Sequence, residues 1–349
     1  MDKCARISRH PDVAVNTKDK ETMYWSWKRY GYWLWSASMM KTYFSDYVNY
    51  FSNTAALLNN AKRKDGKTKL ITGDGTPMDM WDFRGWKMIP QNRGLSEPRY
   101  LTPHLIKHIN PDVKLIVILR NPVDRLYSDY YFIDNGERNK NQTTFHFAVL
   151  KAINVLERCS IRRILRSCLF DFHINADLNK NQQRLVLNFI KIARSSKWST
   201  KTLFLLLTKE EGTTRIHLGF YAIYLREWLS VFPREQMLIL RTEDYSSNVS
   251  SVVKQVFKFL ELRVLTDDEL EKLNITISER VYVTKDKIGK PPMNPKTRQI
   301  LENIHSSDIQ DLYKLLNDER FLWHSQNSVI ENNTENVTQS YKIHYENKI

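Results

Sequence analysis

Chemistry is suggested first by an arginine and a serine that follow a short apolar segment. Residues 115–119 read Leu-Ile-Val-Ile-Leu, and Arg120, the pair Asn121-Pro122 and Ser128 come after them. An unbroken apolar run is typical of a strand buried on both faces of a parallel sheet, and Asn-Pro is typical of a helix start. Anions bind at the carboxyl ends of such strands and at helix N-termini. Arg120 and Ser128 are therefore a candidate anion site, although a surface ion pair and a solvent-facing serine would fit the same pattern.

The segment that begins at Arg120 resembles a known binding element. Its sequence, Arg-Asn-Pro-Val-Asp-Arg-Leu-Tyr-Ser-Asp-Tyr, is similar to the 3′-phosphate-binding element of carbohydrate sulfotransferases, which use 3′-phosphoadenosine 5′-phosphosulfate (PAPS). The resemblance extends to residues 100–104, 219–232 and 238–244 in the family's order, and it is greatest to the N-acetylgalactosamine 4-sulfate 6-O-sulfotransferases. It implies an α/β, P-loop-like sulfotransferase fold with a central parallel sheet flanked by helices. It also implies that Arg120 and Ser128 bind the cofactor.

The same resemblance points to a catalytic pair near the N-terminus. Lys20 and Glu21 match the family's Lys-Glu-Pro stretch, in which the glutamate is the base, although Thr22 replaces the proline. A sugar hydroxyl that attacks sulfur must lose its proton, and a carboxylate within hydrogen-bond reach can accept it. A neighbouring ammonium can stabilise charge on the transferring sulfuryl oxygens. The alternative is a solvated charge pair in a loop.

Two further segments are candidates for contacting the acceptor. Residues 73–77, Gly-Asp-Gly-Thr-Pro, resemble the family's route into the acceptor cleft, so Asp74 and Thr76 are candidate contacts. The same residues are equally ordinary turn chemistry. Arg84 and Lys87 lie in an aromatic and basic loop and are candidates for holding a sulfated sugar.

Of two further cofactor-binding segments of the family, one has a counterpart in this sequence and the other does not. Lys287, Gly289 and Lys290 lie where related enzymes close a basic loop over the cofactor, with an exposed linker as the alternative. The family's phosphosulfate loop, of the Pro-Lys-x-Gly-Thr-Thr type, has no counterpart in the sequence, and residues 6–13 resemble the helix and turn that come after that loop in the family. We therefore expect the first strand and its loop to be missing through truncation at the N-terminus.

The charged residues indicate which chemical class of partner the protein favours. Lys and Arg number 53 against 39 Asp and Glu, which gives a formal net charge of +14. Such an excess favours polyanionic partners. No basic arm, zinc-ligand pattern or aromatic RNA-binding signature is present, so nucleic acid is not expected, and no metal-ligand cluster is found. The resemblance implies a sulfated glycosaminoglycan such as chondroitin or dermatan sulfate as the acceptor, with PAPS as cosubstrate and no metal.

Cysteines and sequons bear on the compartment. The surroundings of Cys159 and Cys168 match a cysteine pair of the family, which implies a disulfide and leaves Cys4 over. Five Asn-x-Ser/Thr sequons lean towards a secretory lumen; they begin at Asn141, Asn248, Asn274, Asn332 and Asn336. No apolar run approaches the roughly 18 residues of a membrane span, and no signal peptide is recognised. The family implies the Golgi lumen, with its membrane anchor absent from this chain.

Organisation and function are predicted from these observations. We predict a sulfotransferase domain over residues 1–324, an insertion at 175–212 that matches no family segment, and a polar, disordered tail at 325–349. The predicted function is PAPS-dependent sulfation of a galactosaminoglycan hydroxyl, the 6-hydroxyl of N-acetylgalactosamine 4-sulfate. The alternative, motivated by the absent loop, is an inactive relative that binds nucleotide or glycan only. Strands are predicted at 69–72, 115–119 and 236–241, and helices at 143–156, 219–232, 248–260 and 295–317.

Overall fold

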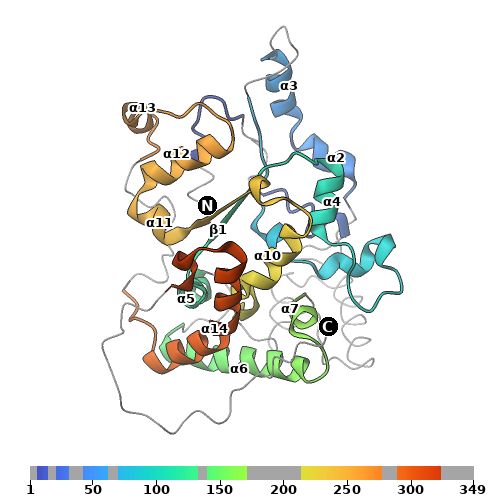
Figure 1. Ribbon diagram of the computed structural model, residues 1–349, viewed down its shortest axis with the longest axis vertical. Coiled ribbons are helices and arrows are strands. Elements are labelled where there is room, and N and C mark those ends of the chain that lie inside the picture. Colours follow the sequence, from blue (N-terminus) through green and yellow to red (C-terminus); the bar gives the residue numbers. More distant parts are fainter. Residues whose placement is uncertain are drawn as a thin grey trace, which may run out of the picture.

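The computed structural model describes seven stretches of the chain, residues 6–14, 21–30, 42–61, 70–132, 140–170, 214–276 and 289–323. In these stretches, helices surround a parallel sheet of two strands (Figure 1). None of the described helices has the length and apolar character needed to cross a membrane. The predictions for Lys20, Lys287, the insertion at 175–212 and the tail at 325–349 lie outside the described residues.

The two strands pair in parallel over their whole length. β1 (Leu115–Leu119) has the bounds expected from its apolar run, and β2 (Met237–Arg241) begins at Met237 rather than Gln236. Leu119 pairs with Arg241, so both strands end at the same edge. Of the strand predicted at 69–72, residues 70–72 are described, and they form one parallel bridge, between Ile71 and Val13.

The sheet separates two hydrophobic clusters. Leu115 and Val117 of β1 pack against the larger cluster, whereas Ile116 and Ile118 pack against the smaller one. The expectation that β1 is buried on both faces holds only in part. Its residues do contact apolar groups on both sides, but only Leu119 is fully buried.

Helices supply the rest of both clusters. The larger one is built mainly from α5, α6, α10 and α14, and the smaller one from α12 and α13; these two groups lie towards opposite sides of the sheet in Figure 1. In chain order the described helices are α2 (Phe44–Asn49), α3 (Ser52–Asn60), α4 (Thr102–Ile109), α5 (Pro122–Phe132), α6 (Gln142–Ser160), α7 (Leu165–Phe170), α10 (Tyr221–Leu229), α11 (Thr242–Ser247), α12 (Val249–Phe259), α13 (Asp267–Lys272) and α14 (Pro295–Leu316).

The predicted helices are confirmed with different ends. The helices expected at 143–156, 248–260 and 295–317 correspond to α6, α12 and α14. The one expected at 219–232 is shorter, because α10 begins at Tyr221 and ends at Leu229. Pro233 follows closely, and the residue before a proline is disfavoured in a helix, which accounts for the early end.

The turn between β1 and α5 is capped as expected. Asn121 Oδ1 accepts hydrogen bonds from the backbone N–H of Val123 at 2.9 Å and of Asp124 at 3.3 Å. Pro122 occupies the first helical position, where its missing N–H costs nothing. The chain therefore passes from the strand end into α5 within a single tight turn.

Helix α14 fixes the start of α10. Asp308 on α14 accepts a hydrogen bond from the backbone N–H of Ala222 at 3.1 Å. The His305 ring lies so close to Gly219 that a Cβ there would come within 2.5 Å of it, so this position requires glycine. The first turn of α10 is thereby satisfied by a side chain from another helix.

The buried Asp308 gives a pH-dependent stability. Burial raises the pKa of Asp308 to about 7, well above its ordinary value of 3.8. When folding raises the pKa of a carboxyl, the unfolding free energy of the protein decreases as the pH rises from the pKa of the unfolded state to that of the folded state. We expect Asp308→Asn, which keeps an oxygen acceptor and cannot ionise, to match the wild type near pH 4 and to exceed it above about pH 7 by a few kcal/mol. Urea unfolding of both proteins across this range checks it; a constant difference would contradict it.

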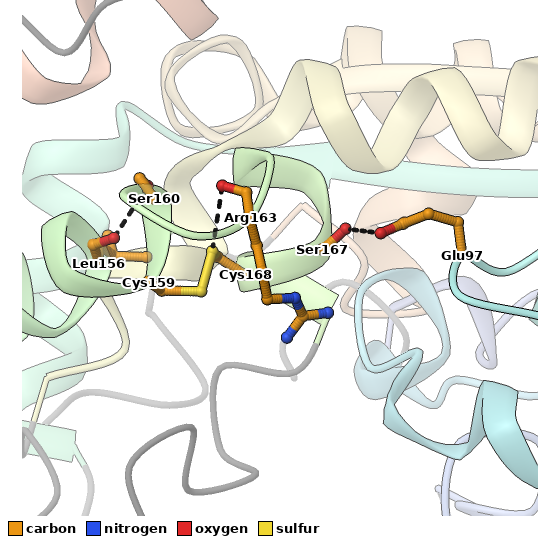
Figure 2. The surroundings of a disulfide bond; sticks show 7 residues. All are labelled: Glu97, Leu156, Cys159, Ser160, Arg163, Ser167 and Cys168. Atoms are coloured by element: carbon orange, nitrogen blue, oxygen red, sulfur yellow. Dashed lines mark hydrogen bonds between the residues drawn. A yellow bond between two sulfur atoms is a disulfide. The ribbon is translucent and has the colours of Figure 1, made fainter.

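A disulfide between Cys159 and Cys168 confirms the predicted pairing. It joins the end of α6 to α7, with the two Cα atoms 5.9 Å apart (Figure 2). The neighbouring Ser167 donates a hydrogen bond to Glu97, which ties α7 to the segment before α4. Cys168 is buried, whereas Cys159 is half-buried.

Removing this disulfide should destabilise the fold modestly. The loop it closes is short, so the double variant Cys159→Ala/Cys168→Ala should lose about 2–3 kcal/mol of unfolding free energy. Denaturant unfolding measures this, and the reduced wild type should approach the variant. Of the three cysteines, one should react as a thiol in the unfolded, unreduced chain and all three after reduction. Three reactive thiols before reduction would contradict the pairing.

Candidate functional site

Polar residues gather where the two parallel strands end. Arg120 follows β1 directly, Ser128 lies on α5, and both are half-buried. Arg241 ends β2 beside two carboxylates, since its side-chain nitrogens lie 3.8 Å from Glu243 and 3.6 Å from Asp244. Arg241 thus forms two ion pairs at the end of β2.

The arginines near α5 differ in their partners. Arg125 contacts Asp129 at 3.4 Å and donates to the Arg215 carbonyl at 2.9 Å, so it holds α5 against the start of the stretch 214–276. Arg215 donates to Asp129 as well, at 2.8 Å. Within the described residues, neither the Arg120 guanidinium nor the Ser128 hydroxyl makes a hydrogen bond or ion pair. Arg120 is therefore a half-buried cation to which the described residues offer no carboxylate partner, an arrangement compatible with an anionic ligand.

The backbone that presents Arg120 is held by two residues that the sequence does not mark as functional. Tyr221 Oη donates to the Arg120 carbonyl at 2.9 Å, and Glu243 Oε1 accepts from the Asn121 N–H at 2.9 Å. Burial raises the pKa of Tyr221 to about 12, so its phenol remains a donor. The sequence pattern places Tyr221 on the core face of its helix; the only sign of another role is that a buried tyrosine hydroxyl needs a partner.

The second cofactor segment lies against α5. Tyr127, next to Ser128, donates to the Pro291 carbonyl at 2.8 Å. Gly289 has a left-handed φ of +72°, a conformation that favours glycine, and Lys290 is exposed. The structure thus brings the stretch containing Gly289 and Lys290 close to the helix that carries Ser128.

The candidate base and the candidate acceptor turn are joined directly. Thr22, which follows the half-buried Glu21, donates its hydroxyl to Asp74. Thr76 accepts from the Met23 N–H at 3.1 Å and donates to Asp74 at 2.7 Å. Asp74 and Thr76, predicted to contact the acceptor, therefore fix the segment that carries Glu21. Burial raises the pKa of Asp74, and the hydrogen bonds from the two threonines oppose that rise.

Arg84 and Lys87 have different surroundings. Arg84 Nε donates to the buried Asp82 at 2.8 Å, and Trp27 Nε1 donates to the same carboxylate at 2.6 Å. Arg84 is therefore connected through Asp82 to the stretch that begins at Glu21. Lys87 is exposed, with its ammonium 5.3 Å from the centre of the Trp86 ring.

Helix α10 contacts both groups of candidate residues, the one around Arg120 and the one around Glu21 and Asp74. At its start Tyr221 bonds to Arg120, and near its end Trp228 Nε1 donates to the Met80 carbonyl at 2.9 Å. Met80 lies in the short helix η2 (Pro77–Met80), which directly follows Thr76. In the described part of the chain, no group of three or more His, Cys, Asp or Glu residues could hold a metal ion.

The described part of the chain is an α/β structure in which two parallel strands end together, and Arg120 at that edge has no carboxylate partner among the described residues. The chain matches the family profile described as "Sulfotransferase domain" over residues 38–287. It therefore belongs to the sulfotransferase domain family, and the predicted α/β sulfotransferase fold is confirmed.

Individual relatives agree with this family. The chain is 30% identical over 325 residues to carbohydrate sulfotransferase 15 of Mus musculus, covering 91% of this chain and 51% of that protein. It is 23% identical over 348 residues to the membrane-associated sulfotransferase kil1 of Dictyostelium discoideum, covering 91% and 62%. A sulfotransferase crystal structure from Alicyclobacillus acidocaldarius aligns over 90% of each chain with a TM-score of 0.45 and 17% identity. The chain spans about half the length of the mouse protein.

Asp74 should be required to keep the Glu21 segment in place. Asp74→Ala would leave the buried Thr22 hydroxyl without its acceptor, so we expect a loss of about 1–3 kcal/mol in unfolding free energy. Denaturant unfolding measures this loss, and limited proteolysis should show earlier cleavage near residue 22. Asp112→Ala, at an exposed turn, is the matched control and should change stability by less than about 0.5 kcal/mol. Equal effects of the two substitutions would contradict the assignment.

Proposed function

We propose that this protein transfers sulfate from PAPS to a hydroxyl of a sulfated galactosaminoglycan, the 6-hydroxyl of N-acetylgalactosamine 4-sulfate in chondroitin or dermatan sulfate. Membership of the sulfotransferase domain family supports the reaction class. One observation supports the donor most directly: the half-buried Arg120, at a strand end and helix start, lacks a carboxylate partner in the described residues. A 3′-phosphate supplies the missing negative charge.

Five of the candidate residues bind the donor or take part in the reaction in this proposal. Arg120 and Ser128 bind the 3′-phosphate, with Gly289 and Lys290 beside them, and this fixes the donor. The acceptor oxygen attacks sulfur and forms the new S–O bond, while the bond from sulfur to the 5′-phosphate oxygen breaks and releases adenosine 3′,5′-bisphosphate. Glu21 takes the proton from the acceptor hydroxyl. Positioning and electrostatic stabilisation supply most of the rate, as in phosphoryl transfer.

Charge and compartment support the acceptor. The formal net charge of +14 favours a polyanionic glycan over a neutral one. Lys87 is exposed in the segment that includes Arg84, so its ammonium is accessible to sulfate groups of the glycan. The disulfide supports a secretory compartment such as the Golgi lumen, because disulfides persist in oxidising environments.

Transfer of radiolabelled sulfate from PAPS to chondroitin 4-sulfate tests the proposal. Arg120→Ala should raise the KM for PAPS roughly 10- to 100-fold, because it removes charge-assisted hydrogen bonds to phosphate. Glu21→Gln should lower kcat about 100-fold or more with little change in the KM for PAPS, because it removes the base. Arg226→Ala is the control, since Arg226 is half exposed and forms a surface ion pair with Asp311.

The outcomes separate the proposal from its alternative. Transfer that is equal in the wild type and Glu21→Gln would remove the assigned base. Binding of adenosine 3′,5′-bisphosphate without any transfer would favour the inactive, nucleotide-binding relative. Absence of both binding and transfer would overturn the donor site itself.

A further inference from the structure

One peptide group in the candidate donor site is held at both of its polar atoms by distant side chains. The carbonyl of Arg120 accepts from Tyr221 Oη, and the N–H of Asn121 donates to Glu243 Oε1, each at 2.9 Å. These two atoms belong to the same peptide bond, the one that joins Arg120 to Asn121. In a trans peptide the C=O and N–H point in opposite directions. Tyr221 and Glu243 therefore hold this peptide plane from its two sides.

This peptide lies in the turn where the chain passes from β1 into α5. Before it comes Leu119, the last residue of β1, and after it Asn121 caps the first turn of α5. A rotation of the plane would change the direction in which the Arg120 side chain leaves the backbone. It would also move the start of α5 and with it Ser128. The distance between the guanidinium and the hydroxyl therefore depends on this one plane.

Both partners are themselves well fixed. Tyr221 is only 6% exposed and opens α10, whose first turn is held by Asp308 of α14. Glu243 lies in the first turn of α11, immediately after β2. The two partners are 101 and 122 residues from the atoms they bind, so the contact is tertiary and not part of local turn geometry.

We propose that Tyr221 and Glu243 are positioning residues of the donor site, which hold the Arg120–Asn121 peptide so that Arg120 and Ser128 meet the same 3′-phosphate. This inference rests on the proposed function, since it concerns how that phosphate is bound. Neither residue contacts the nucleotide. Their effect is on the geometry of the two groups that do.

The helix α10 offers a matched pair of substitutions. Tyr221 and Tyr224 are both buried tyrosines on this helix, but the Tyr224 hydroxyl has no hydrogen-bond partner in the described residues. Tyr221→Phe and Tyr224→Phe each remove one oxygen atom from the same helix. Only the first removes a hydrogen bond to the donor site.

Calorimetric titration of the full chain with adenosine 3′,5′-bisphosphate and with adenosine 5′-phosphate provides the test. We expect Tyr221→Phe to weaken binding of the bisphosphate about fivefold to tenfold and to leave the monophosphate nearly unchanged, because only the former has a 3′-phosphate. Tyr224→Phe should leave both unchanged. Glu243→Ala should behave as Tyr221→Phe does, whereas Glu243→Gln, which keeps an oxygen acceptor, should stay within about twofold of the wild type.

Preference for the 3′-phosphate distinguishes positioning from general stabilisation. A purely structural loss would weaken both nucleotides equally and leave their affinity ratio unchanged, which would overturn the inference. Equal ratios for Tyr221→Phe and Tyr224→Phe would overturn it as well. A wild-type chain without preference for the bisphosphate would instead overturn the proposed donor site. If Glu243→Ala does not fold, the isosteric Tyr221→Phe variant alone decides.

Discussion

The parallel pairing of β1 with β2 is the constraint on which the rest of the structure depends. Because Leu119 lies opposite Arg241, the two strands end together, and the chain turns into a helix at each end. Each turn leaves backbone groups that must find partners, and side chains from the other strand's turn and from α10 provide them. Glu243 is the clearest case, since a residue that follows β2 satisfies an N–H that follows β1. The pairing of the two strands therefore also determines the backbone geometry around Arg120.

A second constraint is that one helix, α10, contacts both the residues around Arg120 and the segment that follows Asp74 and Thr76. Helix α10 bonds to Arg120 at its first residue and, through Trp228, to the Met80 carbonyl near its last. An α-helix rises 1.5 Å per residue, so Tyr221 and Trp228 are about 10 Å apart along the axis. In the proposed function, such a span would separate the donor site from the acceptor site, whose reacting atoms must meet between them. A rigid helix that touches both sides keeps their separation constant, which matters because misplacement by about 1 Å can cost two orders of magnitude in rate.

Much of the fold could be predicted from local patterns. The apolar run at residues 115–119 and the Asn-Pro pair identified β1 and the start of α5, because strand burial and helix capping depend on neighbouring residues. For the candidate site, the local sequence indicated Arg120 and Ser128, but not the side chains that hold the backbone beside Arg120. The partners of its backbone are more than a hundred residues away, and nothing in the local sequence around Tyr221 distinguishes a hydroxyl that bonds from one that does not. Asp74 shows the same limit: a turn sequence indicates a turn, but not that Thr22 will bind to it.

The distribution of carboxylates explains why Arg120 lacks a carboxylate partner in the described part of the chain. With 53 basic and 39 acidic residues, the chain has too few carboxylates to pair every cation. Near the strand ends the available carboxylates are taken by other arginines, Asp129 by Arg125 and Glu243 by its neighbour Arg241. Glu243 accepts a hydrogen bond from the backbone N–H of Asn121, and its other oxygen lies 3.8 Å from Arg241. Among the described residues, no carboxylate therefore pairs with the Arg120 guanidinium. A half-buried cation in this position gains more from a bound phosphate than a fully solvated one, because the interaction is less screened by water.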